Sequence, residues 1–268
     1  MIKTNKQQQQ QNNTFLTAPN ESTLTSLKPS ILAGSIAKVC VNNMNRSIAR
    51  YQLGSFQPDF TLKSARSQLF GASLQSLGVF KTRELLGAGT QKPKTGLAIS
   101  SEFAKNFTAG VVGGLAMHPC CIPFYYLPAE KNKTGPMPSL NSFVAVVKEN
   151  PNILKRGVFP RAMSTGTEFG VYFTLKHLLK DDIENPVALE VASSLPAILG
   201  AIPWHQQYID AINNKAAVKT TSDAINAVDK KAISQFFSRH RIAFVLFTAT
   251  NMLELAILDY TKSKLNHV

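Results

Sequence analysis

Three long stretches of the chain carry almost no charge. Residues Asn106–Ala129 and Val191–Ile209 contain no Asp, Glu, Lys or Arg, and Ile242–Leu258 contains Glu254 alone. A helix needs about 20 mainly apolar residues to cross the hydrocarbon core of a bilayer, and each stretch is near that length. The pattern therefore predicts three membrane-spanning helices.

Three further apolar stretches are interrupted by charges. They are Ile31–Ala49, Gln68–Leu86 and Phe159–Leu179, the last of which contains Arg161 and Glu168. A charge within a bilayer is costly, and it persists where it faces a water-filled cavity or a partner. Six helices around an aqueous cavity explain both the moderate hydropathy and the placed charges. A soluble helical bundle with apolar core helices is the alternative.

The chain contains an internal repeat. Segments aligned without gaps on Gly34, Gly110 and Ser194 have small residues at equivalent positions, which are separated by 76 and 84 residues. Nine residues further on, the second and third segments have Pro119 and Pro203, where the first has an asparagine. A proline inside a helix removes a backbone hydrogen bond, so we expect both helices to kink there. The repeat predicts three tandem pairs of helices.

The charges are mainly basic, and many of them lie between the predicted helices. The chain has 29 Lys plus Arg against 16 Asp plus Glu, which gives a net charge of +13. The connections over residues 53–67, 128–157 and 211–241 hold thirteen basic residues and five acids. Basic loops indicate on which side of a membrane they stay, and they favour anionic lipid as a partner. No basic stripe or aromatic platform accompanies them, so nucleic acid is not an expected partner.

Two stretches in the middle of the chain resemble motifs of the mitochondrial carrier family. Residues 153–161, ILKRGVFPR, resemble the family's L-[KR]-G-x-x-P-R entry to an even-numbered helix. Residues 169–176, FGVYFTLK, resemble the aromatic F-x-x-Y-[DE]-x-x-K pattern that follows it. The resemblance implies an all-α fold of six transmembrane helices in three tandem repeats with pseudo-threefold symmetry. It also implies antiport of a small anionic metabolite (a nucleotide, phosphate or carboxylate) across the mitochondrial inner membrane.

The composition of residues 1–29 predicts a Gln-rich, disordered tail. The resemblance covers the rest of the chain and implies a carrier-like domain over residues 30–264. The three repeats span approximately residues 30–87, 103–180 and 187–264. The chain departs from the family where its odd-numbered helices carry an acid and a base after the kink. Those positions hold Asn45 and Ile48, Cys121 and Phe124, and His205 and Tyr208. The usual ion pairs cannot form there, so either gating uses other contacts or transport is lost.

The start of the chain suggests a second hypothesis about its source and role. It contains five consecutive glutamines, and the composition of the chain is rich in Lys and Asn. Both features would suit a bacterial copy of an organelle carrier that is delivered into a host cell. The alternative function is a soluble helical interaction protein or a secreted effector without transport activity.

Four charged residues are candidates for a substrate site. Arg161 falls near the family's substrate contact point on the fourth helix, and the alternative is an arginine that reaches the membrane interface. Arginine suits phosphate and carboxylate because its guanidinium donates two parallel hydrogen bonds. Arg83, Glu168 and Glu254 are further cavity candidates, with structural ion pairs as the alternative. Lys38 belongs to a basic face of the first helix that could form an electrostatic funnel.

Enzyme chemistry has little support in the sequence. No GxSxG, P-loop, HExxH or Rossmann glycine pattern is present, and we expect no cofactor. His118, Cys120 and Cys121 form a single cluster without a second pair of ligands, so we expect them to pack and not to bind a metal. The sequence therefore predicts a transporter and not an enzyme.

Overall fold

The part of the chain that the computed structural model describes is helical. It covers residues 27–41, 65–90, 92–125, 144, 147–148, 151–212 and 241–265. Within these residues the chain forms helices and turns, with no strand, which confirms the predicted all-α class. Residues 1–26 of the predicted tail, and most of the three basic connections, lie outside the described residues.

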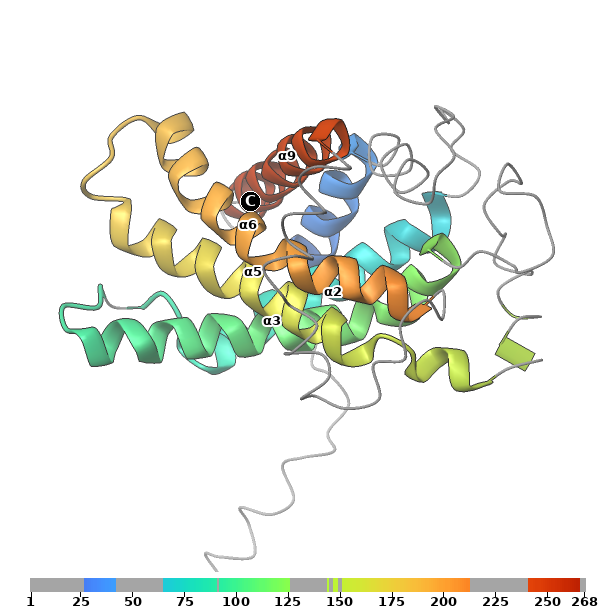
Figure 1. The fold of residues 1–268 in the computed structure, drawn as a ribbon. Helices are drawn as coiled ribbons and strands as arrows, with labels where there is room; N and C mark the ends of the chain where they lie inside the picture. Colours follow the sequence, from blue (N-terminus) through green and yellow to red (C-terminus); the bar gives the residue numbers. More distant parts are fainter. Residues whose placement is uncertain are drawn as a thin grey trace, which may run out of the picture.

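The helices follow the predicted apolar stretches (Figure 1). In chain order they are the helix over residues 27–41, α2 (Ala65–Leu85), α3 (Gly96–Tyr125), the short 3-10 helix η2 (Pro151–Lys155), α5 (Val158–Leu179), α6 (Pro186–Ile212) and α9 (Arg241–Leu265). The first helix begins three residues before the predicted start of the domain at residue 30. Its first turn accommodates Pro29 because the first four amides of a helix have no partner within it.

Side-chain caps fix the beginning of two long helices. The Thr95 hydroxyl accepts a hydrogen bond from the amide of Ala98, 3.2 Å away, so α3 begins well before the uncharged stretch of the sequence. The Asn185 side chain accepts hydrogen bonds from the amides of residues 187 and 188, at 2.9 and 3.1 Å. Pro186 occupies the first position of α6, where its fixed backbone angle suits a helix.

The helices close a ring. Each long helix packs against the next along the chain: α2 against α3, α3 against α5, α5 against α6, and α6 against α9. The helix over residues 27–41 joins the two ends of this series. The hydroxyl oxygens of Ser35 and Ser73 lie 2.6 Å apart and connect it to α2, and Lys38 pairs with Glu254 on α9. The first and last helices of the chain therefore lie side by side (Figure 1).

Small residues at equivalent positions of the first two predicted repeats pack in the same way. A Cβ atom added at Gly34 would come within 2.4 Å of the Ala72 carbonyl oxygen on α2. A Cβ atom added at Gly110 would come within 2.4 Å of the Thr165 carbonyl oxygen on α5. Ser194, at the equivalent position of the third repeat, is fully buried. Small residues at these positions let neighbouring helix backbones approach closely.

The two predicted kink prolines lie inside helices and do not end them. Pro119 is followed by a further turn of α3, which continues to Tyr125, and Pro203 lies within α6 together with Pro196. The ribbon of α6 changes direction along its length in Figure 1. A proline in this position removes a backbone hydrogen bond and permits such a bend.

One described helix is long and apolar enough to cross a bilayer by length and composition. It is α6. The core helix of a soluble protein can pass the same test, so this property alone does not assign a membrane protein. Several other helices carry charged side chains on the faces that they turn toward the centre of the ring, among them Lys38, Arg161 and Glu254.

Candidate functional site

A cavity of about 80 Å³ lies at the centre of the ring. All six helices of the ring contribute to its lining, so residues from distant parts of the sequence meet there. Its charged and polar lining side chains are Lys38, Gln75, Ser76, Arg161, Ser164, Glu168, His205, Asn251 and Glu254. A polar space of this size can hold several water molecules.

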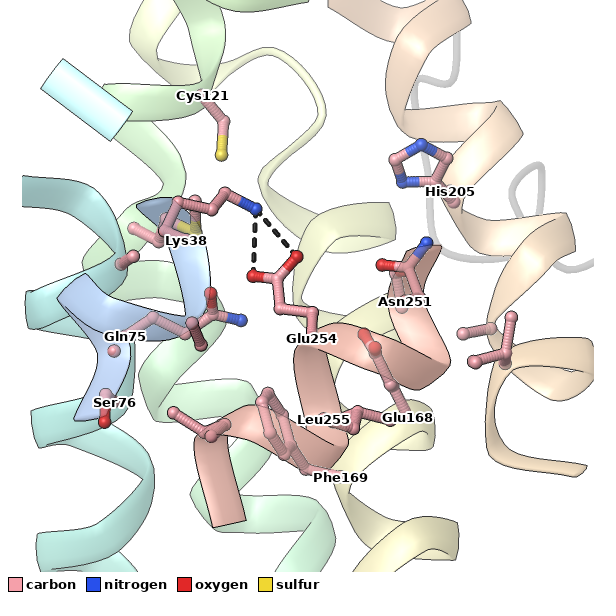
Figure 2. A pocket seen from close by; sticks show the side chains of 18 of the residues that line it. Lys38, Gln75, Ser76, Cys121, Glu168, Phe169, His205, Asn251, Glu254 and Leu255 are labelled. Carbon is pink, nitrogen blue, oxygen red and sulfur yellow. Dashed lines mark hydrogen bonds and ion pairs between the residues drawn. The ribbon is translucent and has the colours of Figure 1, made fainter. Parts of the chain in front are cut away.

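An ion pair between the first and last helices lies beside the cavity (Figure 2). The Lys38 ammonium donates hydrogen bonds of 2.9 and 3.0 Å to the two carboxylate oxygens of Glu254. The two side chains are 10% and 19% exposed, so removal of either partner would leave a poorly solvated charge. Glu254 thus lines the cavity and is also part of a structural ion pair. Lys38 lies in the same pair.

Arg161 lies in the first turns of α5 and lines the cavity. Its side chain is buried, which places it inside the ring and not at an interface. Nη2 donates to the Met117 sulfur at 3.2 Å, and the guanidinium carbon lies 5.5 Å from the centre of the Tyr208 ring. The positively charged guanidinium of Arg161 thus lies beside a thioether and an aromatic ring.

Glu168 lies on the same face of α5, seven residues after Arg161, and also lines the cavity. Its charge interacts with those of Glu254, Arg161 and Lys38. It makes no hydrogen bond and no ion pair with any residue that the structure describes. Figure 2 shows its carboxylate and that of Glu254 entering the cavity from different helices.

Arg83 lies apart from the other three candidates. It belongs to the last turn of α2 and is not among the cavity lining. Its Nε donates a 2.9 Å hydrogen bond to Asn106, and its guanidinium carbon lies 3.6 Å from the centre of the Phe173 ring. The structure therefore brings together Arg161, Glu168 and Glu254 and leaves Arg83 nearer one end of the ring. Neither kink proline lines the cavity.

At the end of the ring where Arg83 lies, polar contacts join neighbouring helices. We call this the polar end. Its charged and amide residues are Arg83, Glu102, Asn106, Lys176, Glu190 and Asp259. The Lys176 ammonium pairs with Glu190 on α6 and lies 2.8 Å from Asp259 on α9. The Tyr172 hydroxyl donates a 2.5 Å hydrogen bond to Glu190. The Asn106 amide donates to Glu102 and Thr174, which connects α3 to α5.

At the opposite end the helices pack through an apolar cluster, and we call it the apolar end. The cluster consists of Met117, Cys121, Ile122, Ile153, Tyr208 and Ile212. Nε2 of His118 donates a 3.0 Å hydrogen bond to the Leu154 carbonyl oxygen, and its ring centre lies 5.6 Å from that of Tyr208. Gly157 has a backbone φ of 72°, and a Cβ there would come within 2.8 Å of the Tyr208 ring. Both the angle and the contact require glycine.

Several cavity residues were not among the predicted site residues. His205, Gln75 and Asn251 are examples. A signal for His205 exists in the repeat alignment, because it occupies the position equivalent to Cys121, and both residues line the cavity. Gln75 lies on α2 and Asn251 on α9, which are the second helices of the first and third predicted repeats. The alignment of the repeats covered only the first helix of each repeat. Among the described residues, no three His, Cys, Asp or Glu side chains come together in a way that could hold a metal ion.

Comparison with known proteins adds no relative from which a function could be transferred. No protein-family model matches the chain, and no curated protein is significantly similar to it. The cavity and the helices around it are therefore the grounds on which a function can be inferred.

Proposed function

We propose that the chain is a membrane carrier of the mitochondrial-carrier type. It exchanges a small anionic metabolite, which is a nucleotide, phosphate or carboxylate, across a bilayer. One observation carries the proposal: six of the described helices close a ring around a cavity that is lined by charged side chains. A ring of this kind offers a solute a polar path through an apolar layer, and intramembrane charges persist where they face such a path. We expect Arg161 to bind the anionic group of the solute.

The lining of the cavity supports an arrangement by repeats. Met117 and Ala201 line it, and they are separated by the 84 residues that relate the second and third repeats. Cys121 and His205 line it with the same separation. Equivalent positions of two repeats thus face one centre, which pseudo-threefold symmetry would produce. Three repeats of two membrane-spanning helices are the architecture that we propose.

The outside of the ring supports a bilayer as the surrounding medium. Large apolar side chains are exposed on α3 at Val112 and Leu115 and on α6 at Val191, Leu195 and Leu199. Buried positions of the chain meanwhile include lysine, arginine, glutamate, histidine, serine and threonine. Most buried side chains are apolar as well, but apolar side chains along one outer face of a helix suit contact with lipid, and buried charges suit a polar cavity. We propose the mitochondrial inner membrane, of a host cell if the protein is a bacterial effector, with anionic lipid at the basic connections.

Exchange by the purified protein in liposomes tests this function. Liposomes are loaded with ADP, phosphate or a dicarboxylate, and uptake of the labelled solute is followed. We expect uptake that requires internal solute and that falls about tenfold or more in Arg161→Ala, because a charged hydrogen bond to the solute is lost. The matched control is Lys180→Ala, which removes an exposed positive charge at the end of the same helix. An inserted protein that exchanges no solute, or an Arg161→Ala variant with full uptake, would contradict the proposal.

A soluble helical interaction protein, or a secreted effector without transport activity, is the second candidate function. One observation favours it: α6 alone among the described helices is apolar and long enough to span a bilayer. Extraction with alkaline carbonate separates the two candidates. A spanning bundle stays in the membrane pellet, whereas a soluble or peripheral basic protein is released into the supernatant.

A further inference from the structure

The charges around the cavity balance one another. Among the described residues its lining holds two cations, Lys38 and Arg161, and two carboxylates, Glu168 and Glu254. Their formal charges sum to zero, although the chain as a whole carries +13. A solute with several negative charges gains from a site of positive potential, and this lining does not supply one. The charge balance thus restricts the class of anion that the cavity suits.

Half of these charges form a pair within the protein. The Lys38 ammonium contacts both carboxylate oxygens of Glu254, at 2.9 and 3.0 Å. A pair of this geometry neutralises its own charges, and separating the two partners would expose a buried charge. The Lys38–Glu254 pair therefore connects two helices and offers a solute little net charge.

The other two charges lie on one helix face with opposite sign. Arg161, Ser164 and Glu168 line the cavity at helical spacings of three and four residues, so they share one side of α5. Seven residues correspond to an axial separation of about 10 Å between Arg161 and Glu168. Glu168 has neither a hydrogen bond nor an ion pair with any described residue. An acid that is enclosed without such a partner gains when a cation enters beside it.

We infer that the transported solute is a small zwitterion, which carries a carboxylate and an amine. The inference rests on the proposed carrier function. It keeps the carboxylate among the proposed solutes and adds an amine that balances the carboxylate's charge, so the solute has no net charge. Arg161 binds the carboxylate through parallel hydrogen bonds, and Glu168 accepts hydrogen bonds from the ammonium group. A nucleotide or phosphate would instead place additional negative charge near Glu168, which repels it.

Exchange of matched solutes by the full-length protein in liposomes tests this inference. The probes are 4-aminobutyrate and L-alanine as zwitterions, and glutarate, phosphate and ADP as anions. 4-Aminobutyrate and glutarate have end groups separated by the same number of methylene groups, and they differ in the charge of one end. We expect the wild-type protein to exchange at least one of the zwitterions faster than it exchanges glutarate.

Variants of Glu168 identify the group that selects the amine. We expect Glu168→Gln to lower zwitterion uptake about tenfold or more while glutarate uptake does not fall, because only the amine loses its counter-charge. We expect Glu168→Lys to reverse the preference in favour of glutarate. The matched control is Glu184→Gln, which removes an exposed carboxylate in the connection before α6. Should Glu168→Lys fail to fold, the uncharged variant still decides the test.

The outcomes separate the inference from the proposed function. Exchange of glutarate, phosphate or ADP without exchange of a zwitterion would overturn the inference and retain the carrier. Unchanged zwitterion uptake in Glu168→Gln, or an equal loss in Glu184→Gln, would also overturn it. An inserted protein that exchanges none of the five solutes would overturn the carrier itself, and the inference with it.

Discussion

Neighbouring helices are held together by different kinds of contact at the two ends of the ring. At the polar end, Lys176 pairs with carboxylates on α6 and α9, and Arg83 contacts both an amide and an aromatic ring. At the apolar end, Tyr208 and Met117 pack with aliphatic side chains from α3, η2 and α6. Ion pairs weaken with salt and depend on exact geometry, whereas apolar packing responds to lost volume.

If the chain is a carrier of the proposed type, the apolar end includes positions at which it departs from the mitochondrial carrier family. Cys121, His205 and Tyr208 stand where that family has acids and bases. Cys121 and Tyr208 belong to the apolar cluster, and His205 lines the cavity beside it. Packing thus connects α3 to α6 at this end without an ion pair among these three positions. If the chain is a carrier, opening this end would expose apolar surface, and opening the other end would separate charges.

The largest difference between the ends is expected for Tyr208→Ala. Tyr208 is fully buried in the apolar cluster, so removal of the ring leaves a cavity and should cost about 4 kcal/mol of unfolding free energy. Thermal unfolding in detergent at low and high salt measures this loss, which we expect to be independent of salt. Tyr208→Phe is the matched control, because it keeps the ring and most of the stability. A loss that shrinks strongly with salt would contradict an apolar contact.

A smaller and salt-dependent effect is expected for Lys176→Met at the polar end. The Lys176, Glu190 and Asp259 side chains are 23%, 17% and 31% exposed, so solvent screens the ion pairs in part. We expect a loss of about 2 kcal/mol at low salt, which falls as salt is added. The same unfolding measurement tests it, with Lys180→Met as a control that removes an exposed lysine. Equal losses at low and high salt would remove the contrast between the two ends.

The smallest effect on stability is expected for an ion pair between two connections beside the polar end, the one before α3 and the one after α5. Lys92 and Asp181 form an exposed ion pair of 2.9 Å, in which the hydrogen bond to Lys92 lowers the pKa of the Asp181 carboxyl. The same contact raises the pKa of Lys92. Because the folded pKa of Asp181 is the lower one, the pair stabilises the fold above the ordinary aspartate pKa. That contribution is lost as the pH falls through the lowered pKa.

An NMR titration of the Asp181 carboxyl carbon measures this shift. We expect a midpoint below that of an ordinary aspartate, and we expect Lys92→Met to move it upward. Lys94→Met is the control, since it removes a neighbouring exposed lysine. An Asp181 midpoint that does not change in Lys92→Met would contradict the role of the pair.

The positions of the helices could be predicted from the sequence with good agreement. The stretches Gln68–Leu86 and Phe159–Leu179 differ by only a few residues from α2 and α5. The agreement has a physical reason, because apolar runs, caps and prolines act over a few neighbouring residues. The beginning of α3 was not predicted: the helix begins at Gly96, ten residues before the uncharged stretch. Glu102 is buried in this helix by contacts with Asn106 and the Gly89 amide, which a count of charges cannot anticipate.

The candidate site was predicted only in part, for a related reason. Arg161 and Glu168 lie on one helix, so their shared face follows from their spacing in the sequence. The partner of Lys38 could not be predicted, because Glu254 is 216 residues away. Arg83 was grouped with the cavity residues because its charge lies in an apolar stretch, yet its place near the end of α2 puts it beside Asn106 and Phe173.

The sequence by itself determined that the described chain is helical and where its long helices lie. These properties depend on local hydrogen bonding, side-chain periodicity and backbone limits, which each segment carries wherever it is placed. Only the tertiary structure decided that the first and last helices meet, that the charges around the cavity balance, and that Glu168 lies there without an ion pair among the described residues. Such features depend on which helix faces turn toward one another, and small residues such as Gly34 and Gly110 set how closely those faces approach.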